Sequence, residues 1–170
     1  MKAGFVQFTP ELCNLDKTLE SLEKLLIDAP PADLLVLPEL CNSGYNFPTR
    51  KDAWEASEEI SDSRFINFLA DHCRKNNMYI ASGFCERDGF KLYNSSVLVG
   101  PEGFIGKYRK IHLFYNEKDI FSAGDVGLPV FQTPVGNIAM LVCFDWMFPE
   151  VWRILALKGA DVICHTSALV

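Results

Sequence analysis

A strand-like run, an amphipathic helix and a second strand-like run follow one another at the N-terminus, and this order constrains the fold most. Residues 3–8 (AGFVQF) show the alternation that is typical of a half-buried strand. Leucines recur at helical spacing among charged residues in 14–28, and Pro30 and Pro31 end that helix. Residues 33–40 (DLLVLPEL) form a short apolar run, which indicates a buried strand. Such a unit predicts an α/β fold.

Further along the chain, hairpin signals alternate with helical patterns. The segment RDGF separates two strand-like runs and predicts a hairpin turn. The mixture of hairpins and strand–helix–strand units predicts an α/β sandwich with a mixed sheet and helices on one face. The remaining expected elements are a helix that begins at Ser61 or Ser63 and ends near Asn76, strands at 78–86, 92–100 and 103–110, a polar loop at 111–125, two strands within 130–144, a helix at 148–159 and a strand at 160–165.

Length and composition indicate one globular domain without nucleic-acid or membrane partners. The chain has 170 residues, of which 49% are hydrophobic and 22% charged, a profile of folded rather than disordered proteins. Its net charge of -6 offers no general attraction to nucleic acid or anionic lipid. No apolar run approaches the roughly 20 residues of a membrane span. The N-terminal segment lacks the apolar region of a signal peptide, so we expect a cytoplasmic protein.

The cysteines and histidines do not suggest a disulfide framework or a metal site. No CxxC pair occurs, and widely spaced cysteines in a protein of this kind favour free thiols. The histidines do not combine with them at the usual spacings of zinc ligands. We expect His112 and His165 to serve local packing and turn hydrogen bonds. The residues concerned are Cys13, Cys41, Cys73, Cys85, Cys143, Cys164, His72, His112 and His165.

Three strand-like segments end in reactive side chains. Glu39 follows LLVLP, Lys110 ends KYRK, and Cys143 lies between MLV and FDW. In α/β sheets, functional sites gather beyond the carboxyl ends of strands. Taken singly, each residue also fits a structural role: a solvated carboxylate for Glu39 and for Glu117, a solvated basic run for Lys110, and an inert buried thiol for Cys143.

Taken together, these segments resemble a known family. LVLPEL, GKYRKIHLF and CFDWMFPE, in that order, are similar to the three signature segments of the nitrilase superfamily of carbon–nitrogen hydrolases. The resemblance extends to FVQFTPE, LYNSSVLVGPEGFIGKYRK and LALKGADVICHTSAL, and so covers essentially the whole chain. PELCNSGYNF and CFDW are most similar to the branch of aliphatic nitrilases and amidases.

The resemblance implies a catalytic triad of Glu39, Lys110 and Cys143, with Glu117 as the second glutamate described for amidases. It implies an α/β fold, a four-layer αββα sandwich of mixed sheets that stack within and between subunits, and hence a homodimer or higher homo-oligomer. Members of the family run well beyond residue 170. We therefore expect residues 1–170 to form a carbon–nitrogen hydrolase domain that is incomplete at the C-terminus.

Residues beside the triad are candidates for substrate binding. Tyr45, in the loop after Glu39, is expected to line the pocket. The backbone N–H of Phe144 is a candidate hydrogen-bond donor at the turn after the cysteine. Trp146 is expected either to touch substrate or to pack as a half-buried ring. Asp145 is expected to cap the helix that follows.

The implied function is hydrolysis of small linear amides or nitriles. A Cys143 thiolate attacks the carbon, Glu39 serves as base and Lys110 stabilises the oxyanion, so ammonia leaves without a metal or organic cofactor. Two alternatives stay open: hydrolysis of N-carbamoyl amines, and an inactive fragment or interaction module of the same fold. The chain stops at Val170 soon after its last expected strand, and unpaired strand edges favour association.

Overall fold

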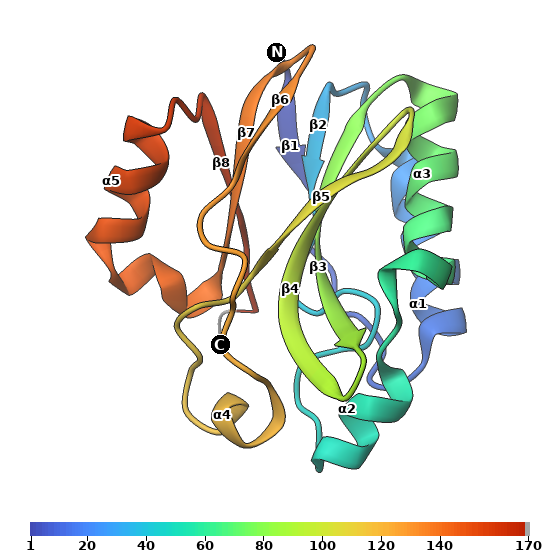
Figure 1. The fold of residues 1–170 in the computed structure, drawn as a ribbon. Coiled ribbons are helices and arrows are strands. Elements are labelled where there is room, and N and C mark those ends of the chain that lie inside the picture. Colours follow the sequence, from blue (N-terminus) through green and yellow to red (C-terminus); the bar gives the residue numbers. More distant parts are fainter. Residues whose placement is uncertain (169–170) are drawn as a thin grey trace.

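The computed structural model describes residues 1–168, and within them the strands form two sheets stacked face to face (Figure 1). Residues 169–170, with Val170 at which the domain was expected to be incomplete, lie outside the described residues. Both sheets contain parallel and antiparallel pairs, as expected from the mixture of hairpins and crossovers. The first sheet has the order β1 (Ala3–Phe5), β2 (Leu34–Val36), β3 (Tyr79–Asp88), β4 (Lys91–Gly100), β5 (Gly103–Arg109), and the second β6 (Val130–Thr133), β7 (Gly136–Val142), β8 (Val162–Thr166).

Helices cover the outer face of each sheet. Helices α1 (Leu15–Asp28) and α3 (Arg64–Asn76) lie on the first sheet, and α5 (Pro149–Leu157) lies on the second (Figure 1). The four-layer αββα sandwich implied by the family resemblance is therefore confirmed. The prediction of one mixed sheet with helices on one face was wrong, because periodicity does not show which strands pair with each other.

The two faces of the first sheet explain the layers. Successive residues of a strand point to opposite faces. Ile80 and Phe84 of β3 therefore pack against α1 and α3, in a core that includes Leu22 and Leu69. Ala81 faces the second sheet, in a core that extends to α5. Both faces are apolar, so the sheet is buried on both sides, as a central layer must be.

Side-chain caps begin the two long helices. Asn14 Oδ1 accepts a hydrogen bond from the Lys17 N–H at 3.1 Å, and Ser63 Oγ accepts one from the Ile66 N–H at 3.0 Å. Ser63, rather than Ser61, is thus the cap of α3. Asn77 ends α3 in the left-handed conformation, with φ of 50°.

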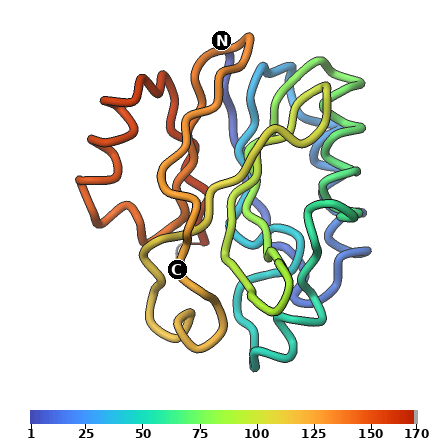
Figure 2. Tube along the Cα trace, viewed as in Figure 1, coloured from blue at the N-terminus to red at the C-terminus, as the bar shows by residue number. Residues whose placement is uncertain are grey.

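Several elements were missed or overestimated. Both strands before residue 40 are shorter than predicted, and the second ends at Val36 because the chain leaves the sheet ahead of Pro38. The connection between β5 and β6, predicted as a polar loop, projects below the sheets and carries a short helix (Figure 2). The elements not predicted are α2 (Arg50–Ala56), α4 (Glu117–Ile120) and the 3₁₀ turns η1 (Ile60–Asp62) and η2 (Cys143–Met147).

A buried ionic network fixes the end of β5. Arg109 donates hydrogen bonds to Glu86 of β3 and to Asp125 in the following loop, the latter at 2.7 Å. Its guanidinium lies 3.7 Å from the ring centroid of Tyr93 on β4. Arg109 and Glu86 are buried, and buried charges persist only when paired and hydrogen-bonded. The network thus holds the strand end directly before Lys110.

None of the helices in the described part of the chain is both long enough and apolar enough to cross a membrane.

Candidate active site

The structure brings together the four residues that the family resemblance implied. Glu39 lies in the loop after β2, Lys110 directly follows β5, Glu117 begins α4, and Cys143 follows β7. The first three are almost fully buried, with 1%, 1% and 3% of their surfaces exposed. Their solvated alternatives are therefore excluded. Residues from both sheets meet at this point.

Lys110 lies between the two carboxylates. Its Nζ donates to Oε1 of Glu39 and to Oε1 of Glu117, each at 2.8 Å. Burial alone lowers the pKa of Lys110, but the two carboxylates outweigh it and raise the pKa above its ordinary value. Lys110 is therefore a permanent cation at neutral pH.

Glu39 is held on both of its oxygens. Oε1 also accepts from Nδ2 of Asn94 at 2.7 Å, and Oε2 accepts from the backbone N–H of Ala168 at 3.0 Å. Burial raises the pKa of Glu39, and the charge and hydrogen bond of Lys110 offset part of that rise. The carboxylate therefore has a higher proton affinity than an exposed glutamate.

A glycine lets the Glu39 backbone approach β3. Gly83 N–H donates to the Pro38 carbonyl at 3.0 Å, and the Cys41 N–H donates to the Gly83 carbonyl at 3.1 Å. A Cβ at Gly83 would lie 2.4 Å from the Glu39 Cα, closer than atoms can pack. Gly83 therefore fixes the position of the Glu39 loop on the sheet.

Cys143 lies at a strained turn beside Glu39. Its φ of 41° is left-handed, a conformation that is uncommon for residues other than glycine. Cys143 is 7% exposed, and its thiol lies beside the Glu39 carboxylate. Burial, followed by the charge of Glu39, raises the pKa of Cys143 to about 12. The thiol therefore keeps its proton until a base removes it, which is the role expected of Glu39.

Asp145 ties the Cys143 turn to the Lys110 loop. Its buried carboxylate accepts from the Val142 N–H at 3.1 Å and from the Tyr108 hydroxyl at 2.8 Å. The backbone N and ring Nδ1 of His112 lie 3.1 and 2.8 Å from Oδ1. The prediction that Asp145 caps the helix from Pro149 was wrong, because these four groups engage both of its oxygens.

Removing Asp145 is expected to destabilise the fold strongly. Asp145→Ala leaves several buried donors without an acceptor, so we expect a loss of at least about 3 kcal/mol in the free energy of unfolding. Tyr108→Phe removes one donor together with its hydroxyl and should cost only about 1 kcal/mol. Chemical denaturation of both variants measures this difference, and equal losses would contradict the role of Asp145.

The predicted substrate-binding residues differ in their surroundings. The hydroxyl of Tyr45 donates to Oε1 of Glu117 at 2.7 Å, so Tyr45 belongs to the charged cluster. Phe144 is half-buried and its ring lies 5.0 Å from that of Phe114. Trp146 is 52% exposed, which excludes a fully packed ring.

Asn94 and two histidines, His112 and His165, also lie near the cluster, and none of them was predicted to take part in catalysis. Asn94 was not singled out from the sequence, since a lone asparagine in a strand pattern carries no spacing signal. His165 Nε2 lies 2.8 Å from the Cys143 carbonyl, and the His112 ring stacks on Phe148 with centroids 3.6 Å apart. The expectation that both histidines serve local packing and turn bonds is confirmed.

The cysteines are free thiols, as predicted. Burial raises the pKa of each of the thiols in the core to about 12, so a perturbed pKa alone does not single out Cys143. Its neighbours do. Within residues 1–168, no group of three or more His, Cys, Asp or Glu side chains is arranged to hold a metal ion. The other core cysteines are Cys41, Cys73, Cys85 and Cys164.

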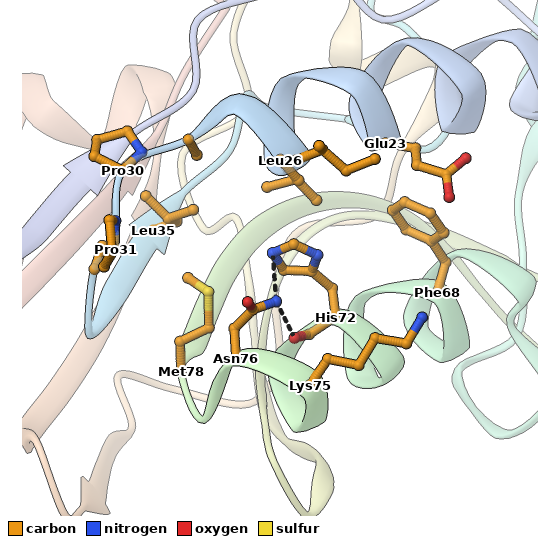
Figure 3. A pocket seen from close by; sticks show the side chains of 13 residues that line it. Glu23, Leu26, Pro30, Pro31, Leu35, Phe68, His72, Lys75, Asn76 and Met78 are labelled. Atoms are coloured by element: carbon orange, nitrogen blue, oxygen red, sulfur yellow. Dashed lines mark hydrogen bonds between the residues drawn. The ribbon is translucent and has the colours of Figure 1, made fainter.

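A separate cavity of about 510 Å³ lies where α1 and α3 approach β2. His72 and Asn76 line it, and the Asn76 amide already donates to the His72 carbonyl at 3.0 Å (Figure 3). Leu26 and Phe68 make much of the remaining wall. Its lining includes one carboxylate, Glu23, and one lysine, Lys75, but no cysteine, so the thiol chemistry of the charged cluster is not duplicated there.

Comparison with known proteins places the chain among relatives of similar fold. A nitrilase of Pyrococcus abyssi is 49% identical over 172 residues, with 100% of this chain and 66% of the relative covered. A β-ureidopropionase of Arabidopsis thaliana is 35% identical over 91% of this chain and 41% of the relative. The crystal structure of a carbon–nitrogen hydrolase from Helicobacter pylori G27 matches with a TM-score of 0.84 and 28% identity, over 99% of this chain and 60% of that one.

The chain thus spans only part of the length of these relatives: 66% of the Pyrococcus protein, 41% of the Arabidopsis protein and 60% of the Helicobacter chain. The family described as carbon-nitrogen hydrolase matches residues 2–169. That range includes both sheets and all four residues of the charged cluster. The chain belongs to the carbon–nitrogen hydrolase family, the nitrilase superfamily of the expected resemblance.

Proposed function

We propose that this protein is a thiol hydrolase that cleaves the carbon–nitrogen bond of small linear amides or nitriles and releases ammonia. One observation supports the proposal: in a buried cluster, the Cys143 thiol and the charged Lys110 ammonium both lie beside the Glu39 carboxylate. A thiol, a base and a cation are the groups that this reaction needs. The proposal concerns the full-length protein.

In the first step, Cys143 Sγ attacks the substrate carbon while its proton moves to Glu39. A thiol with a pKa of about 12 is a poor nucleophile, so proton transfer must accompany the attack. Negative charge then develops on the amide oxygen, or on the nitrogen of a nitrile. An ammonium has three donor protons, and Lys110 uses two on the carboxylates. The third, with the Phe144 N–H, is assigned to the developing charge.

In the second step, Glu39 returns the proton to the leaving nitrogen. The carbon–nitrogen bond of the amide breaks, ammonia departs and a thioester to Cys143 remains. Glu39 then accepts a proton from water, whose oxygen attacks the thioester carbon. The carbon–sulfur bond breaks, the acid product leaves and the thiol regains its proton. A nitrile follows the same course after one added water.

Glu117 is assigned to the charge and position of Lys110 rather than to proton transfer. Its Oε1 accepts from Lys110 and from Tyr45, while its Oε2 accepts from the Phe114 N–H at 2.8 Å. These contacts hold the lysine between two fixed carboxylates. Tyr45 is thereby assigned to the support of Glu117, and Trp146, with its exposed ring, to contact with substrate.

The pH dependence of turnover follows from Glu39. Only the ionised carboxylate accepts a proton, and burial raises its pKa above the ordinary value of 4.5. We therefore expect the acid limb of kcat/KM to have its midpoint above pH 4.5, with activity lost as the pH falls through it. Initial rates between pH 4 and 8 measure this limb. Glu39→Gln has no ionisable group at this position, so its turnover should be lost across the whole pH range.

Hydrolysis of N-carbamoyl amines is a second candidate, favoured by the similarity to a plant β-ureidopropionase. Its products include carbon dioxide as well as ammonia. A screen of small amides, nitriles and carbamoyl amines on the full-length protein, with ammonia and carbon dioxide both measured, separates the candidates. The primary proposal fails if ammonia is never released from an amide or a nitrile.

We propose further that the protein acts in the cytoplasm as a homodimer or higher homo-oligomer. Ile154 and Leu157 on α5 are exposed apolar side chains, the latter by 82%. Exposed apolar residues on one helix favour association with a second copy. Light scattering at several concentrations is expected to give a mass above that of one chain, and a stable monomer at all of them would contradict the assembly.

A further inference from the structure

Asn94 makes hydrogen bonds to Glu39, Lys110 and Glu117, the three charged residues of the cluster. It lies on β4, is 1% exposed, and is paired with Cys85 of β3. Its Nδ2 donates to Oε1 of Glu39 at 2.7 Å and to Oε1 of Glu117 at 3.4 Å. Its backbone carbonyl accepts a hydrogen bond from the Lys110 backbone N–H at 2.8 Å. One residue thus contacts both carboxylates and the backbone of the lysine.

The hydrogen bonds of Glu39 distinguish its two oxygens. A carboxylate oxygen has about two acceptor positions. Oε1 accepts from Asn94 and from Lys110, which fills both. Oε2 accepts only from the Ala168 N–H, and the same N–H also contacts the Cys143 thiol. Oε2 therefore has a free acceptor position on the side of the thiol.

The other end of the Asn94 amide has no partner. Its Oδ1 is the buried side-chain atom among the described residues that makes no hydrogen bond. Rotating the amide would direct this oxygen at two carboxylates, so the carboxylates determine the orientation. Buried polar atoms in native proteins are nearly always paired, and an exception calls for an explanation. The donor function of Nδ2 is that explanation.

We propose that Asn94 is a positioning residue that, with Lys110, occupies Oε1 of Glu39 and so leaves Oε2 as the oxygen that takes the proton of Cys143. The assignment rests on the proposed function. An amide suits this position because it donates without charge: it orients the carboxylates while Lys110 keeps the only positive charge of the cluster. Leucine at 94 has the same branching at Cγ and donates nothing.

The surroundings of Glu39 give the sign of the expected pH effect. The titratable groups that face it are Lys110, Glu117, Cys143 and Tyr45. Burial raises the pKa of Glu39, whereas the hydrogen bonds from Lys110 and Asn94 lower it. Loss of the Asn94 bond therefore raises this pKa further, and a larger share of Glu39 is protonated at a given pH.

The test compares Asn94→Leu with Ser96→Ala in the full-length protein. Ser96 is buried two residues along β4 on the same face, and its hydroxyl contacts only the Met140 sulfur, at 3.3 Å. We expect Asn94→Leu to lower kcat by up to about 100-fold with a smaller change in KM, because the base is misplaced. Its acid limb should move to higher pH, while Ser96→Ala shifts neither. An unmoved limb in Asn94→Leu overturns the proposal.

Two further measurements keep the outcome clear. If Asn94→Leu does not fold, Asn94→Ala removes the amide without a branched side chain and faces the same criteria. The crystal structure of the folded variant should show the Glu39 carboxylate rotated away from Lys110, and an unchanged carboxylate overturns the positioning role without reference to activity. Absence of ammonia release from the wild type instead refutes the proposed function itself.

Discussion

Cys143→Ala is expected to eliminate ammonia release, with a fall in kcat on the order of 10⁴-fold or more, as for removal of a nucleophile elsewhere. Without the sulfur no thioester can form, because no other thiol in the described part of the chain lies beside Glu39. The fold should survive, since alanine removes only the sulfur atom from this buried position. Ammonia assays and circular dichroism on the same preparation measure both parts.

Two matched variants separate the chemistry of Cys143 from its packing. Cys164→Ala removes another buried thiol, on β8, and should leave turnover unchanged. Cys143→Gly should be at least as stable as Cys143→Ala, because glycine adopts the observed φ of 41° without strain. Turnover retained by Cys143→Ala would refute Cys143 as the nucleophile.

Lys110→Met is expected to damage both turnover and stability. Loss of a donor to the developing charge costs about 10²- to 10³-fold in kcat. Loss of the cation leaves Glu39 and Glu117 buried together, and breaking a buried ion pair costs about 3–5 kcal/mol in the free energy of unfolding. Denaturation and initial rates are measured on the same variant.

The stability loss of Lys110→Met should depend on pH. Without the lysine, burial and the charge of Glu117 make Glu39 bind its proton more tightly in the folded state than in the unfolded state. Stability then falls as the pH rises and recovers as it falls. Lys107→Met on β5 is the control: Glu86 keeps its Arg109 contacts, so a loss of about 1 kcal/mol or less and unchanged turnover are expected. A pH-independent loss in Lys110→Met would contradict the paired carboxylates.

The reactive residues were predictable because each lies in a segment with its own local pattern. Glu39, Lys110 and Cys143 all follow strands, and strand ends are visible as the points where apolar runs stop. That they meet was not predictable from the pattern alone. Strand order depends on contacts between residues far apart in sequence, and four strands, β3 to β6, lie in the chain between β2, which precedes Glu39, and β7, which precedes Cys143.

The supporting residues were not predictable for a related reason. Asn94 and Asp145 act through buried hydrogen bonds to other segments, and a single polar residue inside an apolar run leaves no periodic trace. Asp145 even resembled a helix cap, since it precedes a helix and caps often do. The short helices α2 and α4 were missed because a few residues present too little of an apolar face to be recognised.

The reach of one hydrogen bond has a consequence for folding. Ala168 donates to Glu39 across 129 positions of sequence, and such distant contacts form late because closing a long loop is entropically costly. The β3–β4–β5 hairpins, by contrast, join neighbouring segments. During synthesis the glutamate and lysine can therefore pair before β8 and Ala168 have emerged from the ribosome. Only docking of that strand completes the contacts of Glu39 and Cys143, so a nascent chain carries its nucleophile without a finished base.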